Sequence, residues 1–402
     1  MSLGQPDLYI GGQLMQTLKT DPRPALAGLR LGWGNDSRLE MDPPSKLSGQ
    51  LLIKGEMPAF LEVGAPVGLI DPVSARCLFA GTLGPLTASP DDSVRGALRV
   101  GFTAASPLSE LQKHRAVNVA YDANTAASIR FNTLASEMPR GWALTGSTGG
   151  AVAQTKQQYK AIEWITLAER FCRSYLYRYH DTSYYTPGAG LFKRLTFSPE
   201  RGKALSGSLP AAGEAGIWTG TGAPAGASGV AVLPAAGVRT AIDWEKSPED
   251  MITDVQLATF NATEADADRD STRFEVWMQS PPVYADNTAL QDAYGYRQVE
   301  IETSLSAMDL SAFGAQARAI ISYWLDTVNK WRPTGLQLPD SRRLDTAPLL
   351  NLLAVDTRGT AALAVPAATD LAPGLIRSFV MAGSATWTGK KWITDITLGR
   401  TL

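Results

Sequence analysis

Apolar and polar residues alternate with a period of two near both ends of the chain, which predicts strands with one buried face. In residues 97–103, for example, Leu98, Val100 and Phe102 alternate with small or polar residues. Clusters of glycine and proline separate these runs, as turns do in β-rich proteins. The expected strands are 29–33, 46–54, 67–70, 76–87, 98–103, 252–260, 272–278, 296–305, 352–356, 361–365, 376–383 and 392–398.

The middle of the chain changes to a helical spacing of apolar residues. One set runs from Ala127 to Met138, and a stricter one from Ala161 to Tyr175, which indicates helices with one apolar face. We interpret these faces as packing on their own domain. A third stripe, from Phe313 to Val328, predicts an amphipathic helix at about 309–330, with Asp309 as its N-cap.

A strand that leads into a helix occurs twice, at Val94–Val117 and at Gly295–Lys330. In the first unit Ser106 offers an N-cap and Pro107 occupies the first helical position. The units lie about 200 residues apart, so we expect each to close its own small β-barrel.

These patterns predict a β-rich α+β protein with two small β-barrel domains and an intervening helical or mixed domain. A Gly/Ala/Pro-rich segment interrupts the chain and is expected to be a loop or linker. The predicted divisions are 1–118 for the first barrel, 119–205 for the mixed domain, 206–240 for the linker, and 241–402 for the second barrel with its one helix.

Composition supports a packed protein, with 44% hydrophobic and 19% charged residues. The net charge of −2 argues against nucleic-acid binding through phosphate contacts. The charge is uneven, because residues 151–205 hold 9 Lys/Arg and 4 Asp/Glu, whereas residues 241–310 hold 4 Lys/Arg and 15 Asp/Glu. This asymmetry has two interpretations: complementary surfaces between subunits or partners, or ordinary solvated faces.

The two cysteines, Cys77 and Cys172, are too few for a disulfide framework and sit in apolar patterns, so buried free thiols are expected. The N-terminal residues lack a basic segment followed by an apolar one, and no run of 18 apolar residues exists. We therefore expect neither a signal peptide nor a transmembrane helix, and a soluble protein made in a cytoplasm.

Motifs for catalysis or metal binding are weak throughout. His114 and His180 fall in different predicted domains and have no metal-type spacing. The glycine-rich stretch 146–150 lacks the strand–loop–helix context of a phosphate loop. No pair of carboxylates stands out among the 39 acidic residues as a glycosidase pair.

One acidic stretch resembles the start of a calcium loop, through Asp266, Asp268 and Asp270. The match fails because Ser271 and Trp277 stand where such a loop needs glycine and glutamate. The sequence therefore predicts no catalytic, cofactor-binding or metal-binding residues, no cofactor, and a protein that is not an enzyme.

Five tyrosines and His180 gather in residues 175–185. They could form an aromatic platform for a sugar or a partner. The favoured interpretation is a helix end and a hairpin whose tyrosines cover the core with their hydroxyl groups in water.

The order of several motifs resembles baseplate hub or minor tail proteins of long-tailed bacteriophages. In the first half these are LRLGWGNDSRLEMDPPSKLSGQLLI, CLFAGTLGPLTA and LRVGFTAASPLSELQKHRAV. In the second half they are IDWEKSPEDMITDV, AYGYRQVEIETSL, the predicted helix of residues 313–328, and FVMAGSATWTGKKWITDITL. The resemblance covers most of the chain except about 203–240.

The resemblance implies a homotrimer in which two barrels per subunit form a six-barrel ring under a hexameric tail tube. Such a ring, at the tail tip of the virion, joins the tube through a distal tail protein to tip or fibre proteins. It surrounds the tape-measure protein and the DNA channel, without sequence-specific nucleic-acid binding or stable membrane insertion. Because the chain ends at Leu402 after the last barrel strand, no appended peptidoglycan hydrolase is expected.

Two other functions compete with this one. The first is a receptor-binding tail protein that holds host cell-wall glycan through the tyrosine-rich segment, with Tyr184 and Tyr185 as the residues to substitute. The second is a cell-wall hydrolase with an unrecognised carboxylate site, which zymography on host wall would detect.

Overall fold

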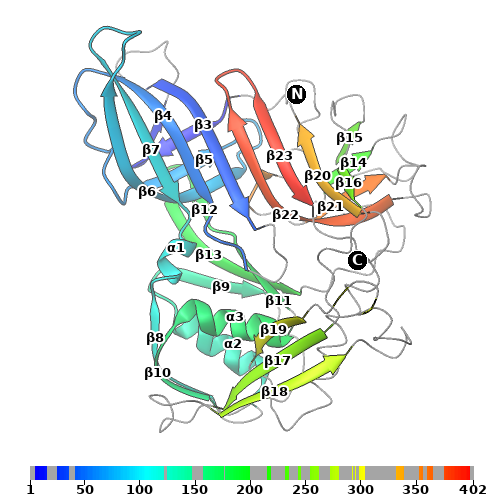
Figure 1. Ribbon diagram of the computed structural model, residues 1–402. Coiled ribbons are helices and arrows are strands. Elements are labelled where there is room, and N and C mark those ends of the chain that lie inside the picture. The colour runs from blue at the N-terminus through cyan, green and yellow to red at the C-terminus, as the bar shows by residue number, and fades with distance from the viewer. Residues whose placement is uncertain are drawn as a thin grey trace.

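A computed structural model gives the fold of the chain (Figure 1). The structure describes residues 5–15, 25–35, 41–121, 125–146, 157–175, 177–199, 215–218, 231–234, 243–245, 254–261, 272–279, 292, 295, 298–303, 332–338, 353–355, 360–364 and 375–398. The predicted helix at about 309–330 and the Asp266–Asp270 stretch lie outside these residues.

The N-terminal strands form a curled antiparallel sheet in the order β3-β4-β7-β6-β5-β1-β2. In β7 the buried residues Val100, Phe102 and Ala104 alternate with less buried ones, as predicted, whereas β5 is buried on both faces. The strands are β1 (Asp7–Ile10), β2 (Gln13–Met15), β3 (Ala25–Gly34), β4 (Lys46–Lys54), β5 (Pro66–Ile70), β6 (Cys77–Pro90) and β7 (Ala97–Ala105).

Strands from the C-terminal part continue this sheet. The order β16-β20-β23-β22 leads directly to β3, because residues 382–387 of β22 pair antiparallel with residues 29–34 of β3. The two ends of the chain therefore meet in one hydrogen-bonded sheet (Figure 1). These strands are β16 (Asp243–Glu245), β20 (Arg332–Leu338), β22 (Leu375–Trp387) and β23 (Trp392–Leu398).

The core under this sheet is shared by both parts of the chain. Leu31, Leu47 and Val100 from the N-terminal strands belong to the same buried cluster as Ala385 and Trp392 from the C-terminal strands. The predicted β-rich α+β class is confirmed, because the strands form a curled half-barrel sheet and the helices lie in a mixed unit below it. The domain boundaries themselves stay predictions.

The segment predicted as a linker contains two short strands, β14 (Ala215–Trp218) and β15 (Ala231–Pro234). They pair in parallel with each other, and β14 also pairs with β21 (Thr360–Ala364). Because β21 pairs with the first half of β22, this segment is attached to the large sheet of its own chain.

A mixed unit lies below the large sheet in Figure 1, with helices between its strands. Its buried residues form a second core, to which α1 contributes Leu108 and Leu111. The elements are α1 (Leu108–Leu111), β8 (Arg115–Tyr121), α2 (Ala127–Ser136), β9 (Trp142–Gly146), β10 (Gln157–Glu163), α3 (Trp164–Tyr175), β11 (Tyr177–Asp181), β12 (Tyr184–Thr186) and β13 (Gly190–Pro199).

Two local predictions in this unit are wrong. The stripe expected to be helical from Ala161 begins as strand, because β10 runs to Glu163 and α3 starts only at Trp164. Ser106 does not cap α1 with its side chain: its hydroxyl accepts the Ser45 backbone N–H at 3.0 Å. The cap comes instead from Asp181, 73 residues away, whose Oδ2 accepts the Leu108 N–H at 3.1 Å.

In the described residues the strand of the second strand-into-helix unit enters a separate sheet, so the expectation that this unit closes its own small β-barrel is wrong. In the first unit β7 is an inner strand of the large sheet, antiparallel to β4 and β6. In the second, β19 (Gln298–Thr303) pairs in parallel with β17 (Asp254–Asn261), whose other neighbour is β18 (Thr272–Gln279). This separate three-stranded sheet lies against α3 of the mixed unit.

Candidate functional surface

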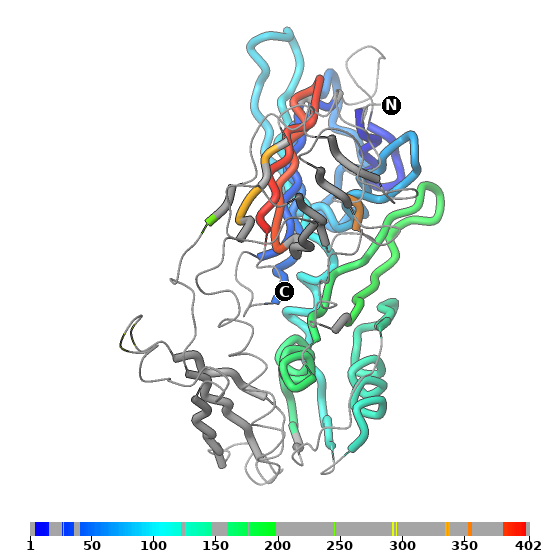
Figure 2. Tube along the Cα trace, turned by 90° about the vertical axis from the view of Figure 1, so that its right-hand side faces the viewer, coloured from blue at the N-terminus to red at the C-terminus, as the bar shows by residue number. Residues whose placement is uncertain are grey.

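The hairpin of β12 and β13 connects the mixed unit to the large sheet. Figure 2 shows it rising from the mixed unit to the N-terminal strands, and β12 contacts both β5 and β6. Strand alternation gives the hairpin two faces, because Tyr185 and Leu191 point to the large sheet while Tyr184 and Phe192 point away from it.

On the inner face, the Tyr185 ring occupies a gap left by a glycine. A Cβ built on Gly68 of β5 would lie 2.2 Å from Tyr185 Cδ1, so no other residue fits there without displacing the ring. Tyr185 is 3% exposed and packs on Tyr9, with the ring centroids 5.6 Å apart. Its backbone N–H also donates to the Cys77 sulfur at 3.4 Å.

Polar contacts fix α1 to β11 and β13. Asp181 accepts the Ser183 N–H through Oδ1 at 3.0 Å and the Leu108 N–H through Oδ2 at 3.1 Å. Lys193 of β13 donates to both carboxylate oxygens of Glu110, at 2.8 and 2.6 Å. The start of the mixed unit is therefore held against its later strands by charged hydrogen bonds.

A third contact joins β11 to the residues that directly precede β4. Asp42 accepts from Arg178 Nη2 at 2.9 Å and lies 3.0 Å from His180 Nδ1, and the three side chains are largely shielded from solvent. Burial acts to raise the pKa of Asp42, but the hydrogen bonds and charges of His180 and Arg178 outweigh it and hold the pKa below its usual value. We call this group the Asp42 latch.

The outer face of the hairpin carries a row of exposed and half-buried side chains that we call the outer strip. Its members come from β9, β13, β12 and the β11–β12 turn, and the register of the strands places them on one face. They are Thr145, Thr182, Tyr184, Phe192, Arg194 and Thr196.

Aromatic stacking orders one end of the outer strip. The Tyr184 and Phe192 rings are stacked, with centroids 4.9 Å apart and planes 12° from parallel. The Arg194 guanidinium lies 5.1 Å from the Tyr184 centroid, and Arg194 Nε donates to Thr182 Oγ1 at 3.1 Å. Phe192 remains 40% exposed, which leaves part of its ring open to solvent.

Threonine hydroxyls continue the row. Thr196 Oγ1 lies 2.7 Å from Thr182 Oγ1 and 2.9 Å from Thr145 Oγ1, so the three hydroxyls form one hydrogen-bonded chain. Because hydroxyl groups both donate and accept, this chain can adjust its direction to what binds it.

The tyrosine-rich segment thus divides between two roles. Tyr177, Tyr179 and Tyr185 are buried, as the favoured interpretation required. Their hydroxyls were expected in water, and that is wrong for Tyr179, whose hydroxyl lies 3.5 Å from Glu169 Oε1 and whose pKa is raised chiefly by burial. Tyr175 and Tyr184 are half-buried, and of these two Tyr184 lies on the outer strip as part of an aromatic platform.

The other candidate residues have structural places. His114 Nε2 donates to the Glu137 carbonyl oxygen at 2.8 Å, whereas His180 belongs to the Asp42 latch. Gly146 ends β9 with a φ of 132°. Neither cysteine forms a disulfide; Cys172 is buried as predicted, whereas Cys77 is only partly buried.

Within the described residues, no group of three or more His, Cys, Asp or Glu side chains is placed to hold a metal ion. The same part of the chain contains no helix that is long and apolar enough to cross a membrane. Sequence reasoning missed Asp42, Asp181, Phe192 and Arg194, which act through contacts between distant segments. For Phe192 and Arg194 a signal existed in the strand alternation of residues 190–197.

No protein-family model matches the sequence, and no curated protein matches it. Solved structures do match. The tail protein from Neisseria meningitidis MC58 aligns with a TM-score of 0.54 and 11% identity, over 98% of this chain and 95% of the other. The chain has a phage tail protein fold.

A second solved structure agrees with the first. The 43 kDa tail protein of prophage MuSo2 from Shewanella oneidensis aligns with a TM-score of 0.53 and 11% identity, over 98% of both chains. The tail-protein fold therefore accounts for the large sheet and the mixed unit together, and not for one of them alone.

Proposed function

We propose that the chain is a structural component of a bacteriophage tail tip, a baseplate hub or minor tail protein, and that three copies form a ring. The observation that carries this proposal is the fold match to two tail proteins over nearly the whole length of each chain. At 11% identity this match establishes the fold, and the proposed position in the tail rests on the arrangement of the strands in the large sheet.

The large sheet supports a ring. It presents two groups of barrel-type strands side by side, β3–β7 with β1 and β2 on one side and β22, β23, β20 and β16 on the other. Three such chains would present six groups, which matches the symmetry of a hexameric tube. Rotational symmetry of this kind requires heterologous contacts that close on themselves.

The proposed neighbours follow from that position. The ring joins the tail tube, through a distal tail protein, to tip or fibre proteins, and it surrounds the tape-measure protein and the DNA channel. In this role the protein has no catalytic residues or cofactor, reads no nucleic-acid sequence and does not insert stably into membranes.

Charge complementarity between subunits is a separate part of the proposal. Within one chain, β19 of the acidic stretch already lies against α3 of the basic stretch. If the asymmetry also acts between subunits, charge reversals on either stretch will change assembly and its salt dependence. Unchanged assembly at every salt concentration would contradict this part alone.

Electron microscopy of purified particles tests the main proposal. We expect three copies of the chain at the tail tip, with the two strand groups of each copy facing the tube. A protein found in many stacked rings along the tail, or only in peripheral fibres, would refute it.

A further inference from the structure

The outer strip is a group of solvent-accessible side chains to which the ring proposal gives no role. It combines an open aromatic face, one cation and a chain of hydroxyls on a sheet that three separate contacts fix in place. Such preorganisation lowers the entropic cost of binding.

Arg194 is the charged centre of the strip. Its Nε is held by Thr182, and its backbone N–H is bound by Ser183 Oγ. In the described part of the chain its two Nη groups donate to no residue, and its neighbour across the β13–β9 pairing, Ala143, is too small to cover them. A guanidinium fork held this way matches a carboxylate.

The surrounding charges favour an anionic ligand. On the same face, register places His180 beside Thr196 and Arg178 next along β11, and both are bound to Asp42. Among the described residues of this face Asp42 is acidic, and it already accepts from Arg178 and lies 3.0 Å from His180 Nδ1. Among the described residues, no acidic side chain pairs with Arg194.

The strip excludes two common kinds of peptide partner. An extended peptide cannot add to β13 as a strand, because β9 occupies one edge of β13 and β11 and β12 occupy the other. An amphipathic helix needs an apolar groove, whereas this face offers two rings followed by arginine and threonine.

We propose that the outer strip binds a carbohydrate that carries carboxylate groups. The apolar face of a sugar ring packs on the open part of Phe192, the carboxylate takes the Nη groups of Arg194, and ring hydroxyls exchange hydrogen bonds with Thr182, Thr196 and Thr145. This activity is independent of the ring proposal, because it needs only this face of one chain.

Calorimetric titration of the full-length protein tests it, with trigalacturonic acid as the probe. Neutral galactotriose and a triglutamate peptide, each at the same concentrations, separate the sugar from the carboxylate. We expect saturable binding of the acidic sugar, about tenfold weaker binding of the neutral one, and no saturable binding of the peptide. Equal binding of all three probes would overturn the proposal. So would the absence of binding of the acidic sugar at about 10 mM, since a shallow site is expected to bind with a dissociation constant of about this order.

Paired variants locate the site. Phe192→Ala should weaken binding of the acidic sugar at least about tenfold, whereas Ile129→Ala, at an exposed apolar residue on α2, should leave it unchanged. Arg194→Gln should remove the preference for the acidic sugar over the neutral one, and Arg115→Gln on β8 should keep it. Thermal unfolding confirms that each variant is folded, and an unaltered preference in Arg194→Gln would refute the role of the guanidinium. Failure of this test leaves the tail-tip proposal intact, because particle microscopy decides that separately.

Discussion

Two joints in the molecule place an aromatic ring over a glycine, but they are supported differently. At the sheet joint, Trp33 of β3 covers Gly383 of β22, and a Cβ on Gly383 would lie 2.3 Å from Trp33 Cζ2. At the hairpin joint, Tyr185 covers Gly68 in the same way. The first joint lies within a ladder of backbone hydrogen bonds, whereas the second joins two different sheets.

The two joints are held rigid by different kinds of interaction. The sheet joint adds ring packing to paired strands, so both ends of the chain share one core. The hairpin joint depends on side chains: the Tyr185 ring, the Asp181 cap and the Asp42 latch. We therefore expect damage at the sheet joint to unfold the protein, and damage at the hairpin joint to loosen the mixed unit first.

The largest effect should come from Gly383→Val. A branched side chain there overlaps the Trp33 ring, which is only 8% exposed and has little room to move. We expect a loss of about 3–4 kcal/mol, at the upper end for overpacking. Urea unfolding measures this loss, provided that the m-value of the variant equals that of the parent protein.

Gly32→Ala is the matched control for this change. A Cβ on Gly32, one residue before Trp33 on β3, meets nothing within 4 Å. This variant should stay within about 0.5 kcal/mol of the parent protein, as ordinary surface changes do. Equal destabilisation by Gly383→Val and Gly32→Ala would show that the ring does not set the requirement for glycine.

Tyr185→Ala should have the next largest effect, and its neighbour supplies the contrast. Removing the buried ring leaves a cavity above Gly68 and should cost about 3 kcal/mol. Tyr184→Ala removes a half-buried ring from the opposite face and should cost less than about 1 kcal/mol.

Hydrogen exchange distinguishes local from global loss at this joint. In Tyr185→Ala we expect faster exchange in residues 184–192 while β4 and β7 stay protected. If β4 and β7 lose protection to the same extent, the hairpin joint is part of the main cooperative unit, and the contrast between the two joints is wrong.

How far the sequence could predict these joints follows from the range of the interactions. The alternation of apolar and polar residues predicted β4 at its observed bounds, because the polarity of each residue indicates whether its side of the strand is buried. The pairing of β22 with β3 joins residues some 350 positions apart, and no local pattern specifies a partner. The prediction for the second strand-into-helix unit was wrong for the same reason, since nothing in the sequence of β19 specifies which sheet it joins.

The surface was still harder to predict from the sequence. Tyr184 and Tyr185 look alike in sequence, and only the position of Gly68 decides which ring is buried. The Asp181 cap replaced the expected Ser106 cap because a partner for the Leu108 N–H arrives from a strand 73 residues later. Local capping rules do not contain that information.

Asp42→Asn should have an intermediate effect with a defined pH dependence. The change leaves Arg178 without its carboxylate partner in a largely buried place, which should cost about 2 kcal/mol near pH 6. The folded state lowers the pKa of Asp42, so its contribution is fully present above the ordinary pKa of 3.8 and is lost as the pH falls through the lower folded value.

Chemical unfolding at several pH values checks this sign. The difference in free energy of unfolding between the parent protein and Asp42→Asn should be constant from about pH 5 to 6 and should shrink below about pH 4. A gap that widens in acid would contradict the latch. Asp181→Asn is a useful comparison, because it removes the negative charge from the cap of α1 and leaves the latch in place.

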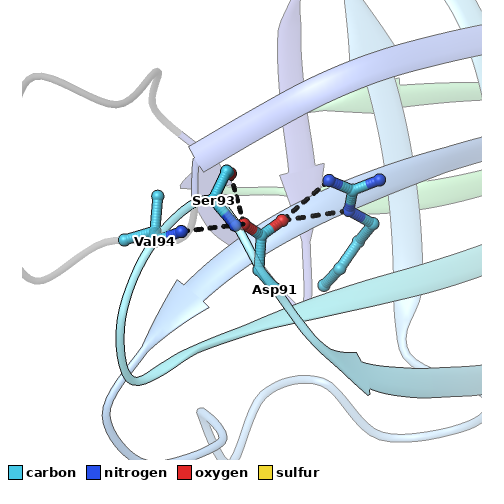
Figure 3. A network of polar contacts seen from close by, with 4 residues as sticks. Asp91, Ser93 and Val94 are labelled. Carbon is cyan, nitrogen blue, oxygen red and sulfur yellow. Dashed lines mark hydrogen bonds and ion pairs between the residues drawn. The ribbon is translucent and has the colours of Figure 1, made fainter.

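The smallest effect should come from Asp91, which lies in neither joint. It sits in the turn between β6 and β7, where the hydroxyl of Ser93 and the guanidinium of Arg99 donate to it, together with the backbone N–H groups of Ser93 and Val94 (Figure 3). The Ser93 hydroxyl, followed by Arg99, lowers the pKa of Asp91 to about 2.

Asp91→Asn should therefore lower stability slightly at neutral pH. It should also remove the loss of stability that the parent protein shows as Asp91 is protonated between about pH 4 and pH 2. Because the turn lies apart from both joints, its effect should add to that of Asp42→Asn in the double variant. Unfolding curves of the two single variants and the double variant at pH 3 and pH 6 measure this. If the double variant changes the free energy of unfolding by more or less than the sum of the single variants, the β6–β7 turn and the Asp42 latch are coupled through the large sheet. The hairpin joint would then not be separate from the large sheet and more weakly held.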